Sequence, residues 1–245
     1  MELDGRLISK VAAYKPSTES IDPIRETPIL FVVGISGAGK DTIQSQLIAK
    51  YDSQYHPIIS HTTRPMRENN GVMEQNGVEY HFIDFATADK MLDERAFVEA
   101  KVVHFNNIYG TSIKEIQEAR DSQKIAITDI EIKGVKEYVE LGMNVKPVFL
   151  LPPSYDVWWT RLTSRYKGNI DQHDLYKRMK TALVELEHAL NVDYFYIVIN
   201  DDIDKTVDLV NQIAHGEPIE PHFQKAMDIA RAIVAEIRRQ LSEME

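Results

Sequence analysis

Short apolar runs alternate along this chain with longer segments in which apolar residues recur every three or four positions. The apolar runs have the length of buried strands and lie at 29–33, 124–129, 145–151 and 194–199. The amphipathic segments predict helices at 42–50, 113–122, 132–141, 155–164, 175–191 and 203–215. This alternation predicts an α/β fold in which helices cover both faces of a mainly parallel sheet.

Three segments fall outside the alternation. Residues 1–27 contain two prolines and little periodicity, so we expect an N-terminal extension that is partly ordered at best. Within the main domain at 28–215, residues 60–111 are polar, aromatic and turn-rich, which predicts an insertion with short strands of its own.

Residues 216–245 predict a C-terminal amphipathic helix. Its apolar positions recur at helical spacing and are Phe223, Ala226, Met227, Ala230, Ile233, Val234, Ile237 and Leu241. Such a helix packs on the surface of its own domain, which we favour, or mediates a homodimer through the same apolar stripe.

Composition narrows the kind of protein. The chain has 245 residues, of which 43% are hydrophobic, enough for a substantial core. Its net charge of −10 argues against a nucleic-acid polymer as partner. No apolar run reaches the roughly 20 residues of a membrane helix, and the first residues lack a signal-peptide pattern. Since there is also no cysteine, which fits a reducing compartment, we expect a cytoplasmic protein without membrane contact.

The segment after the first strand carries the clearest chemical signal. It reads Gly-Ile-Ser-Gly-Ala-Gly-Lys-Asp-Thr and stands between a predicted strand and a predicted helix. Glycines let the backbone wrap closely around an anion, and the helix N-terminus adds partial positive charge. The lysine reaches the outer phosphates. The motif predicts a nucleoside triphosphate site formed by Gly34, Ile35, Ser36, Gly37, Ala38, Gly39, Lys40, Asp41 and Thr42, which the family resemblance described below identifies as the ATP site.

One position departs from the usual phosphate-loop pattern. Asp41 stands where a serine or threonine normally ligates Mg²⁺. A carboxylate is a good magnesium ligand but adds negative charge beside the phosphates. The sequence leaves open whether Asp41 holds the ion, contacts it through water, or faces away. Asp129 ends a predicted strand and suits a second contact, so the predicted magnesium ligands are Asp41, Thr42 and Asp129.

A second set of motifs lies in the insertion and continues beyond it. Within 60–111 the motifs are Ser60-His-Thr-Thr-Arg64-Pro-Met-Arg67, Glu74-x-x-Gly-x-x-Tyr80, Phe97-Val-Glu99 and Tyr109-Gly-Thr111. Further on are Asp129-Ile-Glu-Ile-Lys-Gly134, Pro-Pro-Ser154, Arg161-Leu-x-x-Arg165, Lys177-Arg178 and Asn200-Asp-Asp202. In this order the motifs closely resemble those of the guanylate kinase family, over about residues 29–215.

The resemblance implies an α/β P-loop NTPase fold with a mainly parallel five-stranded core sheet, an inserted monophosphate-binding region at 60–111 and a helical lid at 160–178. It implies the reaction ATP + GMP → ADP + GDP, with Mg²⁺ as cofactor. The residues implied to bind GMP are Ser60, Arg64, Arg67, Glu74, Tyr80, Glu99, Tyr109, Thr111 and Asp129. The residues implied to stabilise the transferring phosphoryl group are Lys40, Arg161, Arg165 and Arg178. Asn200 is implied to contact adenine, although an Asx turn explains it nearly as well.

The hydrogen-bonding pattern of guanine agrees with these assignments. Guanine N1–H and its 2-amino group are adjacent donors, and one carboxylate, here Glu99, can accept from both. Hydroxyl groups of Ser60 and Thr111 can donate to O6, whereas adenine presents the opposite pattern. A site of this kind can discriminate by about 10⁴-fold or more.

Two other functions stay open from the sequence. A guanylate-kinase-like binding module would hold a phosphopeptide in the monophosphate pocket, but we would expect it to lack the phosphate loop or the lid arginines. A kinase of another phosphate ester, such as ribose 1,5-bisphosphate, would account for Asp41. That substrate would not require Glu99 or the motif from Glu74 to Tyr80.

Overall fold

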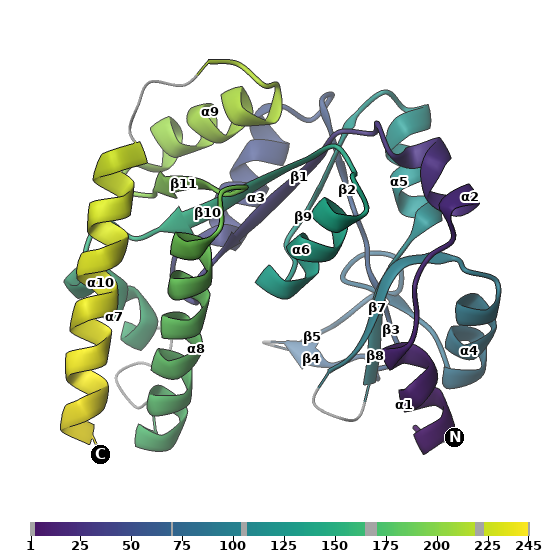
Figure 1. Cartoon of the computed structure of the whole chain (residues 1–245), viewed down its shortest axis with the longest axis horizontal. Helices are drawn as coiled ribbons and strands as arrows, with labels where there is room; N and C mark the ends of the chain where they lie inside the picture. Colours follow the sequence, from purple (N-terminus) through teal and green to yellow (C-terminus); the bar gives the residue numbers. More distant parts are fainter. Residues whose placement is uncertain (1–2, 70, 104–106, 165–170, 219–222, 245) are drawn as a thin grey trace. The chain divides into compact units, whose positions relative to one another are not determined.

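The computed structural model describes residues 3–69, 71–103, 107–164, 171–218 and 223–244 (Figure 1). These residues form two compact units, which are described separately. Unit 1 comprises Met1–Pro28, Gln54–Thr128 and Lys136–Asn144, and unit 2 comprises Ile29–Ser53, Asp129–Val135 and Val145–Glu245.

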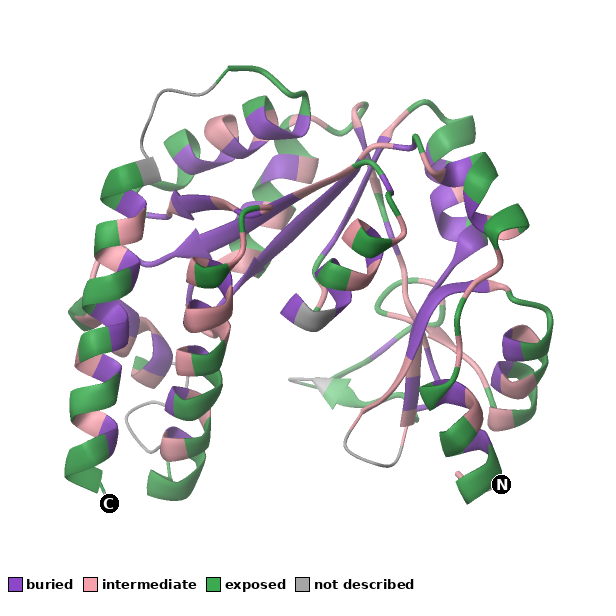
Figure 2. Cartoon of the chain, viewed as in Figure 1, coloured by how far each residue is buried: buried purple, intermediate pink, exposed green. Residues whose placement is uncertain are grey.

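The main sheet has five strands in the order β11-β10-β1-β9-β2. The strands are β1 (Ile29–Gly34), β2 (Tyr55–Pro57), β9 (Ile125–Thr128), β10 (Val145–Leu151) and β11 (Tyr196–Ile199). β10 pairs in parallel with both β1 and β11, and β2 pairs in parallel with β9. Every residue of β1 is buried, as expected for a strand covered on both faces (Figure 2). The predicted α/β fold with a mainly parallel five-stranded sheet is therefore confirmed.

Five helices surround the strands of unit 2. They are α3 (Lys40–Lys50), α7 (Tyr155–Ser164), α8 (Gln172–Asn191), α9 (Ile203–Ala214) and α10 (Phe223–Met244). α3 packs against α9, and α10 lies along α8 (Figure 1). All five were predicted, but α8 begins three residues earlier than expected because Asp171 caps it by accepting from the N–H of His173.

The apolar stripe of α10 is used inside unit 2. The helix contacts α8, β11 and α7. Its buried residues are Ala226, Ala230, Ile233, Val234, Ile237 and Leu241. The favoured prediction, packing on the chain's own domain, is confirmed, and these residues are not exposed to a second copy.

Unit 1 contains the predicted insertion. Its four-stranded sheet has the order β6-β3-β8-β7, and β4 and β5 form a separate pair. The strands are β3 (His61–Thr62), β4 (Glu68–Asn69), β5 (Val72–Met73), β6 (His81–Phe82), β7 (Phe97–Val103) and β8 (Asn107–Ser112). Two helices flank these strands in sequence, α5 (Ile113–Asp121) and α4 (Phe85–Asp93), of which α4 was not predicted. The helix α6 (Ile132–Glu140) was predicted.

The N-terminal segment is more ordered than its sequence suggested. It forms α1 (Gly5–Ala12), α2 (Thr18–Ile21) and the 3₁₀ turn η1 (Asp22–Ile24). The expectation of partial order is wrong for the described residues because α1 has a capping side chain and a buried face. Asp4 accepts from the N–H of Leu7, and Leu7 and Val11 join a buried cluster with residues of α4, β7 and β8. Within the described ranges, no helix has both the length and the hydropathy needed to cross a bilayer.

Candidate active site

The phosphate loop of unit 2 connects β1 to α3 and is packed too closely for side chains at two positions. A Cβ on Gly34 would lie 2.5 Å from the backbone oxygen of Leu150. A Cβ on Gly39 would lie 2.5 Å from Asn200 Nδ2, and Gly39 adopts φ = 93° as the N-cap of α3. Both positions therefore require glycine, as the loop motif predicted.

Three carbonyl groups of the loop accept hydrogen bonds from side chains. Lys40 Nζ donates to Gly34 at 2.8 Å, Trp158 Nε1 to Ser36 at 2.8 Å, and Asn200 Nδ2 to Ala38 at 2.8 Å. In a trans peptide the N–H points opposite to the carbonyl. The N–H groups that follow Ser36 and Ala38 therefore point away from Trp158 and Asn200, which suits binding of an anion. Trp158 is fully buried, and its bond to the loop was not predicted.

Asn200 joins the phosphate loop to the predicted lid. Its side chain is buried, and its backbone oxygen accepts from Arg161 Nη1 and Nη2 at 3.1 and 3.2 Å. Its Oδ1 is buried and has no hydrogen-bond partner among the described residues. An Asx turn would use that oxygen locally, so this alternative is wrong. An orphaned acceptor of this kind fits a donor such as the 6-amino group of adenine.

Two of the three predicted lid arginines lie among the described residues. Arg161 lies on α7 and contacts Asn200 as described above. Arg178 is half-buried on α8, and Arg165 lies outside the described residues.

Asp129 lies in unit 2 with the phosphate loop, not in unit 1 with the other residues predicted to bind GMP. Burial raises the pKa of Asp129, the negative charge of Asp41 raises it further, and Lys40 opposes the change. Asp41 and Thr42 are exposed in the first turn of α3. Two carboxylates that repel each other beside a phosphate loop fit a divalent cation. The described residues hold no cluster of three metal-ligating acidic, His or Cys side chains, so phosphate oxygens and water would complete the coordination.

Glu185 on α8 is an acidic residue near Lys40 that the sequence did not single out. Burial raises its pKa to about 7, an effect that Lys40 opposes and Glu131 reinforces. Together with Glu131 it lines a cavity of about 380 Å³. A glutamate on an amphipathic helix usually faces solvent, so only the fold identifies this residue as part of the site.

In unit 1, the Arg64 guanidinium is held from several sides. Its Nη1 and Nη2 donate to the two carboxylate oxygens of Glu74 at 2.7 and 3.0 Å, and its Nε donates to the Tyr109 hydroxyl at 3.2 Å. The guanidinium also lies 5.1 Å from the centre of the Tyr80 ring. Arg64 and Glu74 are both buried, and their hydrogen bonds lower the pKa of Glu74 to about 2. The structure thus brings together four residues predicted to bind GMP.

Glu74 links the two arginines predicted to bind phosphate. Besides pairing with Arg64, it accepts from the backbone N–H of Arg67 at 2.7 Å, while the Arg67 side chain is exposed. A carboxylate repels a phosphate, so we expect Glu74 to orient Arg64 rather than to contact the phosphate of the nucleotide.

Replacing Glu74 with glutamine is expected to raise the KM for GMP about tenfold or more, because the charge-assisted bonds that hold Arg64 are lost. We expect kcat to change little, since the phosphate loop is untouched. Steady-state kinetics with varied GMP would measure the effect. The matched control is Glu79→Gln, at an exposed glutamate of the same segment. A lower KM in Glu74→Gln would mean that Glu74 competes with phosphate for Arg64.

The predicted guanine-recognising residues lie in one row across three strands. Glu99 on β7 is opposite Thr111 on β8, and the N–H of Thr111 donates to Glu99 Oε1 at 3.0 Å. On the other side of β8, His61 is opposite Gly110 in an antiparallel pair, and this register places Ser60 opposite Thr111. Directly opposed residues share one face of a sheet. Glu99 and Thr111 are therefore neighbours in the sheet, and Ser60, which directly precedes β3, is next in the same register.

Burial raises the pKa of Glu99 to about 7, although Lys101 and the hydrogen bonds from Thr111 oppose the change. Glu99 and Thr111 are both buried. The carboxyl therefore changes its protonation state near neutral pH, which makes its hydrogen-bonding pattern sensitive to pH.

Glu115 and His81, which the sequence did not single out, bind the backbone groups around Ser60. Glu115 is buried, and its two carboxylate oxygens lie 2.9 Å from the N–H of Ile59, which donates, and from His81 Nε2. The backbone N–H of His81 donates to the carbonyl of Ser60 at 2.9 Å. Glu115 stands in the first turn of α5, where an acidic residue is common, so the sequence offered no signal for this contact.

Comparisons with known proteins agree with this arrangement. The sequence model of the guanylate kinase family matches residues 26–217. The guanylate kinase of Chromohalobacter salexigens is 32% identical over 197 residues, which cover 80% of this chain and 87% of that protein. That of Schizosaccharomyces pombe is 33% identical over 199 residues, 81% of this chain and 92% of that protein.

A solved structure shares the fold. The crystal structure of guanylate kinase from Anaplasma phagocytophilum superposes with a TM-score of 0.57 at 21% identity, covering 85% of this chain and 97% of that one. The residues matched by the family model include both the phosphate loop and the residues predicted to recognise guanine. The chain belongs to the guanylate kinase family.

Proposed function

We propose that this chain transfers the γ-phosphoryl group of ATP to GMP, giving ADP and GDP. The observation that carries the proposal is the row formed by Ser60, Thr111 and Glu99 across neighbouring strands, in a chain that also has a complete phosphate loop. Membership of the guanylate kinase family supports the same reaction.

Recognition of GMP divides between its base and its phosphate. The Glu99 carboxylate accepts from guanine N1–H and the 2-amino group, while the hydroxyls of Ser60 and Thr111 donate to O6. Arg64, Arg67, Tyr80 and Tyr109 bind the phosphate. The Tyr109 hydroxyl oxygen already accepts from Arg64, so its hydrogen can donate to a phosphate oxygen.

The ATP phosphates bind the loop from Gly34 to Thr42, and Asn200 Oδ1 accepts from adenine. A phosphate oxygen of GMP attacks the γ-phosphorus, and the bond from that phosphorus to the bridging oxygen of ADP breaks. A phosphomonoester has a second pKa of about 6, so the attacking oxygen is largely ionised at neutral pH and needs no general base. Lys40 and the lid arginines Arg161, Arg165 and Arg178 stabilise the charge that develops, and transfer requires alignment of both nucleotides with water excluded.

Asp129, Asp41 and Thr42 would hold Mg²⁺, with Asp41 contacting the ion directly or through water. The repulsion between Asp41 and Asp129 supports this assignment. When bound, the ion neutralises phosphate charge. The proposed location is the cytoplasm, and a chain without cysteine, and so without disulfides, fits such a reducing compartment.

The two alternatives are less well supported. A phosphopeptide-binding module would not need Lys40 or a loop braced by Trp158 and Asn200. Ribose 1,5-bisphosphate lacks the guanine arrangement of two N–H donors beside a carbonyl acceptor, so it would not require a buried carboxylate next to a hydroxyl as at Glu99 and Thr111.

Product analysis tests the proposal. The chain is incubated with Mg²⁺, γ-labelled ATP and, separately, GMP, dGMP, AMP, UMP or ribose 1,5-bisphosphate, and the labelled product is identified. We expect labelled GDP from GMP. A labelled product from ribose 1,5-bisphosphate in place of GDP, or GMP binding without any transfer, would select one of the alternatives instead.

We expect GMP binding to strengthen as pH rises through about 7, the pKa to which burial raises Glu99. Below that value the protonated carboxyl presents an O–H to the guanine donors, and above it the carboxylate accepts from both. A group with this pKa is about one-tenth ionised one unit below it, so the KM for GMP should be about tenfold higher near pH 6 than near pH 8.

The Glu99→Gln variant is the control for this profile, because it retains the separate titration of the GMP phosphate. In this variant the fall in the KM for GMP as pH rises through about 7 should be absent. The same profile in both proteins would assign the effect to another group.

A further inference from the structure

The N-terminal segment packs against the strand that carries Glu99. Most of it, including α1, lies before residue 26, where the match to the family model begins. Leu7 and Val11 of α1 are buried in one cluster with Phe97 and Ala100 of β7 and with residues of α4. A segment outside the family match is therefore in direct contact with the base-recognising strand.

Tyr14 makes the most specific contact in this region. Its hydroxyl donates to the carbonyl of Phe97 at 2.6 Å and accepts from the N–H of the same residue at 3.0 Å. The two rings also meet edge to face, with their centroids 6.3 Å apart. β7 is at the edge of the four-stranded sheet, where backbone groups have no neighbouring strand on one side. The Tyr14 hydroxyl thus serves as the hydrogen-bond partner that a strand would supply at Phe97.

Phe97 stands directly before an irregularity that determines where Glu99 points. Phe97 is opposite Ser112 and Glu99 is opposite Thr111, so two steps along β7 match one step along β8. A bulge of this kind re-aims the side chain next to it. The bulge is fixed by Tyr14 on one side and, on the other, by the bond from Thr111 N–H to Glu99.

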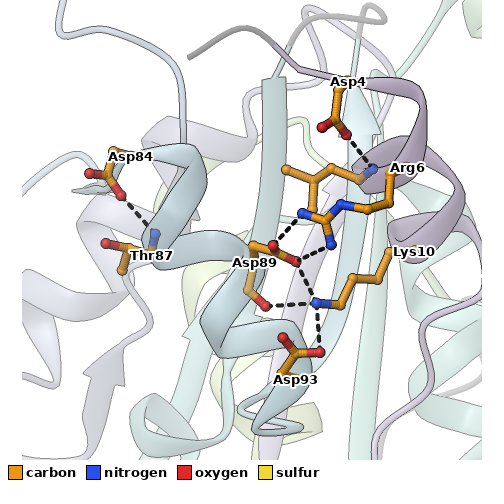
Figure 3. Close-up of polar contacts among 8 residues, drawn as sticks. Asp4, Arg6, Lys10, Asp84, Thr87, Asp89 and Asp93 are labelled. Atoms are coloured by element: carbon orange, nitrogen blue, oxygen red, sulfur yellow. Dashed lines mark hydrogen bonds and ion pairs between the residues drawn. The ribbon is translucent and has the colours of Figure 1, made fainter.

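Ion pairs between α1 and α4 hold the segment that carries Tyr14 (Figure 3). Arg6 Nη2 lies 2.5 Å from Asp89 Oδ2, and Lys10 Nζ lies 2.6 Å from Asp93 Oδ1 and also pairs with Asp89. These pairs lower the pKa of Asp89 to about 2. The helix is therefore anchored to α4 by charge at its exposed side and by Leu7 and Val11 at its buried side.

Arg95 holds the other end of the segment. Its Nη1 donates to the carbonyl of Lys15 at 2.7 Å, and its guanidinium lies 5.6 Å from the centre of the Tyr14 ring. The chain is thus held on both sides of Tyr14, by α1 before it and by the contact at Lys15 after it. This support keeps the Tyr14 hydroxyl in place to bind the backbone of Phe97.

We propose that Tyr14 is a positioning residue for guanine recognition, which fixes the bulge at Phe97 and through it the direction of the Glu99 carboxylate. The inference rests on the proposed function and extends it, since it makes the N-terminal segment part of the base specificity without any contact to the base. A purely structural role would lower stability and affect all substrates alike. A positioning role selectively affects substrates that depend on Glu99.

The test is Tyr14→Phe in the full chain, which removes one hydroxyl and retains the ring. We expect kcat/KM for GMP to fall about tenfold through KM, the effect of losing one hydrogen-bonded contact, with kcat and the KM for ATP unchanged. Inosine monophosphate lacks the 2-amino group and makes only one of the two bonds to Glu99, so its kcat/KM should fall less. The preference for GMP over inosine monophosphate should therefore shrink.

Tyr51→Phe is the matched control, because it removes a hydroxyl that bonds Asp208 at 2.8 Å in unit 2. Tyr51→Phe should change neither kcat/KM for GMP nor the preference for GMP over inosine monophosphate. A second variant, Asp89→Asn, weakens the anchor of α1 and should move the GMP preference in the same direction as Tyr14→Phe. Thermal unfolding of all variants separates stability from recognition.

An unchanged preference for GMP over inosine monophosphate in Tyr14→Phe, with or without a lower melting temperature, would overturn the inference while leaving the proposed function intact. Absence of GMP turnover in the unmodified chain would overturn the proposed function and this inference with it.

Discussion

Replacing Lys40 with alanine is expected to lower kcat by about 10²-fold to 10³-fold or more, the range seen when one charge-stabilising donor is removed from an active site. The dissociation constant for GMP should stay within about threefold, because Lys40 lies in unit 2 and Ser60, Thr111 and Glu99, which we propose recognise the base, lie in unit 1. Stopped-time product assays at saturating ATP and GMP give the first quantity, and isothermal titration with GMP gives the second.

Lys50→Ala is the matched control for Lys40→Ala. Lys50 is on the same helix, where it pairs with Asp208 at the surface, and it takes no part in the proposed chemistry. Its removal should leave kcat unchanged. If Lys40→Ala lost GMP affinity while keeping its maximal rate, the assignment of Lys40 to the triphosphate would be wrong.

Replacing Glu99 with glutamine is expected to lower kcat/KM for GMP about 10²-fold or more. The amide keeps one acceptor but puts an NH₂ donor against the donors of guanine, so a charge-assisted bond is lost and a buried donor is left unpaired. The KM for ATP should not change, and activity with AMP should not fall in parallel.

The control for Glu99→Gln is Glu118→Gln, at an exposed glutamate on α5. It should match the unmodified chain in all constants. A Glu99→Gln variant that still preferred GMP over AMP to the original extent would remove Glu99 from base recognition.

The sheet was predictable where strands are buried, because β1 and the second half of β10 from Val148 to Leu151 appear in the sequence as continuous apolar runs. β2 was not, since three residues with one buried side chain, Tyr55, give no period. α1 was missed for a related reason. Two turns of helix are barely stable alone, and this one depends on packing against α4 and β7, about 80 residues away in sequence.

The candidate site shows the same division between local motif and distant contact. Ser60, Glu99 and Thr111 were predicted because each belongs to a short motif in a recognisable order, and the structure then placed them in one row. Glu74 also belonged to such a motif, but the motif did not show that its carboxylate accepts two hydrogen bonds from Arg64.

Glu115 and Tyr14 carried no motif at all. Each acts on a backbone group far along the chain, Glu115 on Ile59 and Tyr14 on Phe97, so only the folded structure reveals them. Sequence patterns report which groups can react or bind, whereas the residues that aim those groups depend on tertiary contacts.

The ratio of the specificity constants for GMP and AMP, measured with saturating Mg²⁺ and ATP, tests the central claim most directly. A site that reads guanine through a buried carboxylate and two hydroxyls should favour GMP by about 10⁴-fold or more. Equal specificity constants for the two nucleotides would contradict the account.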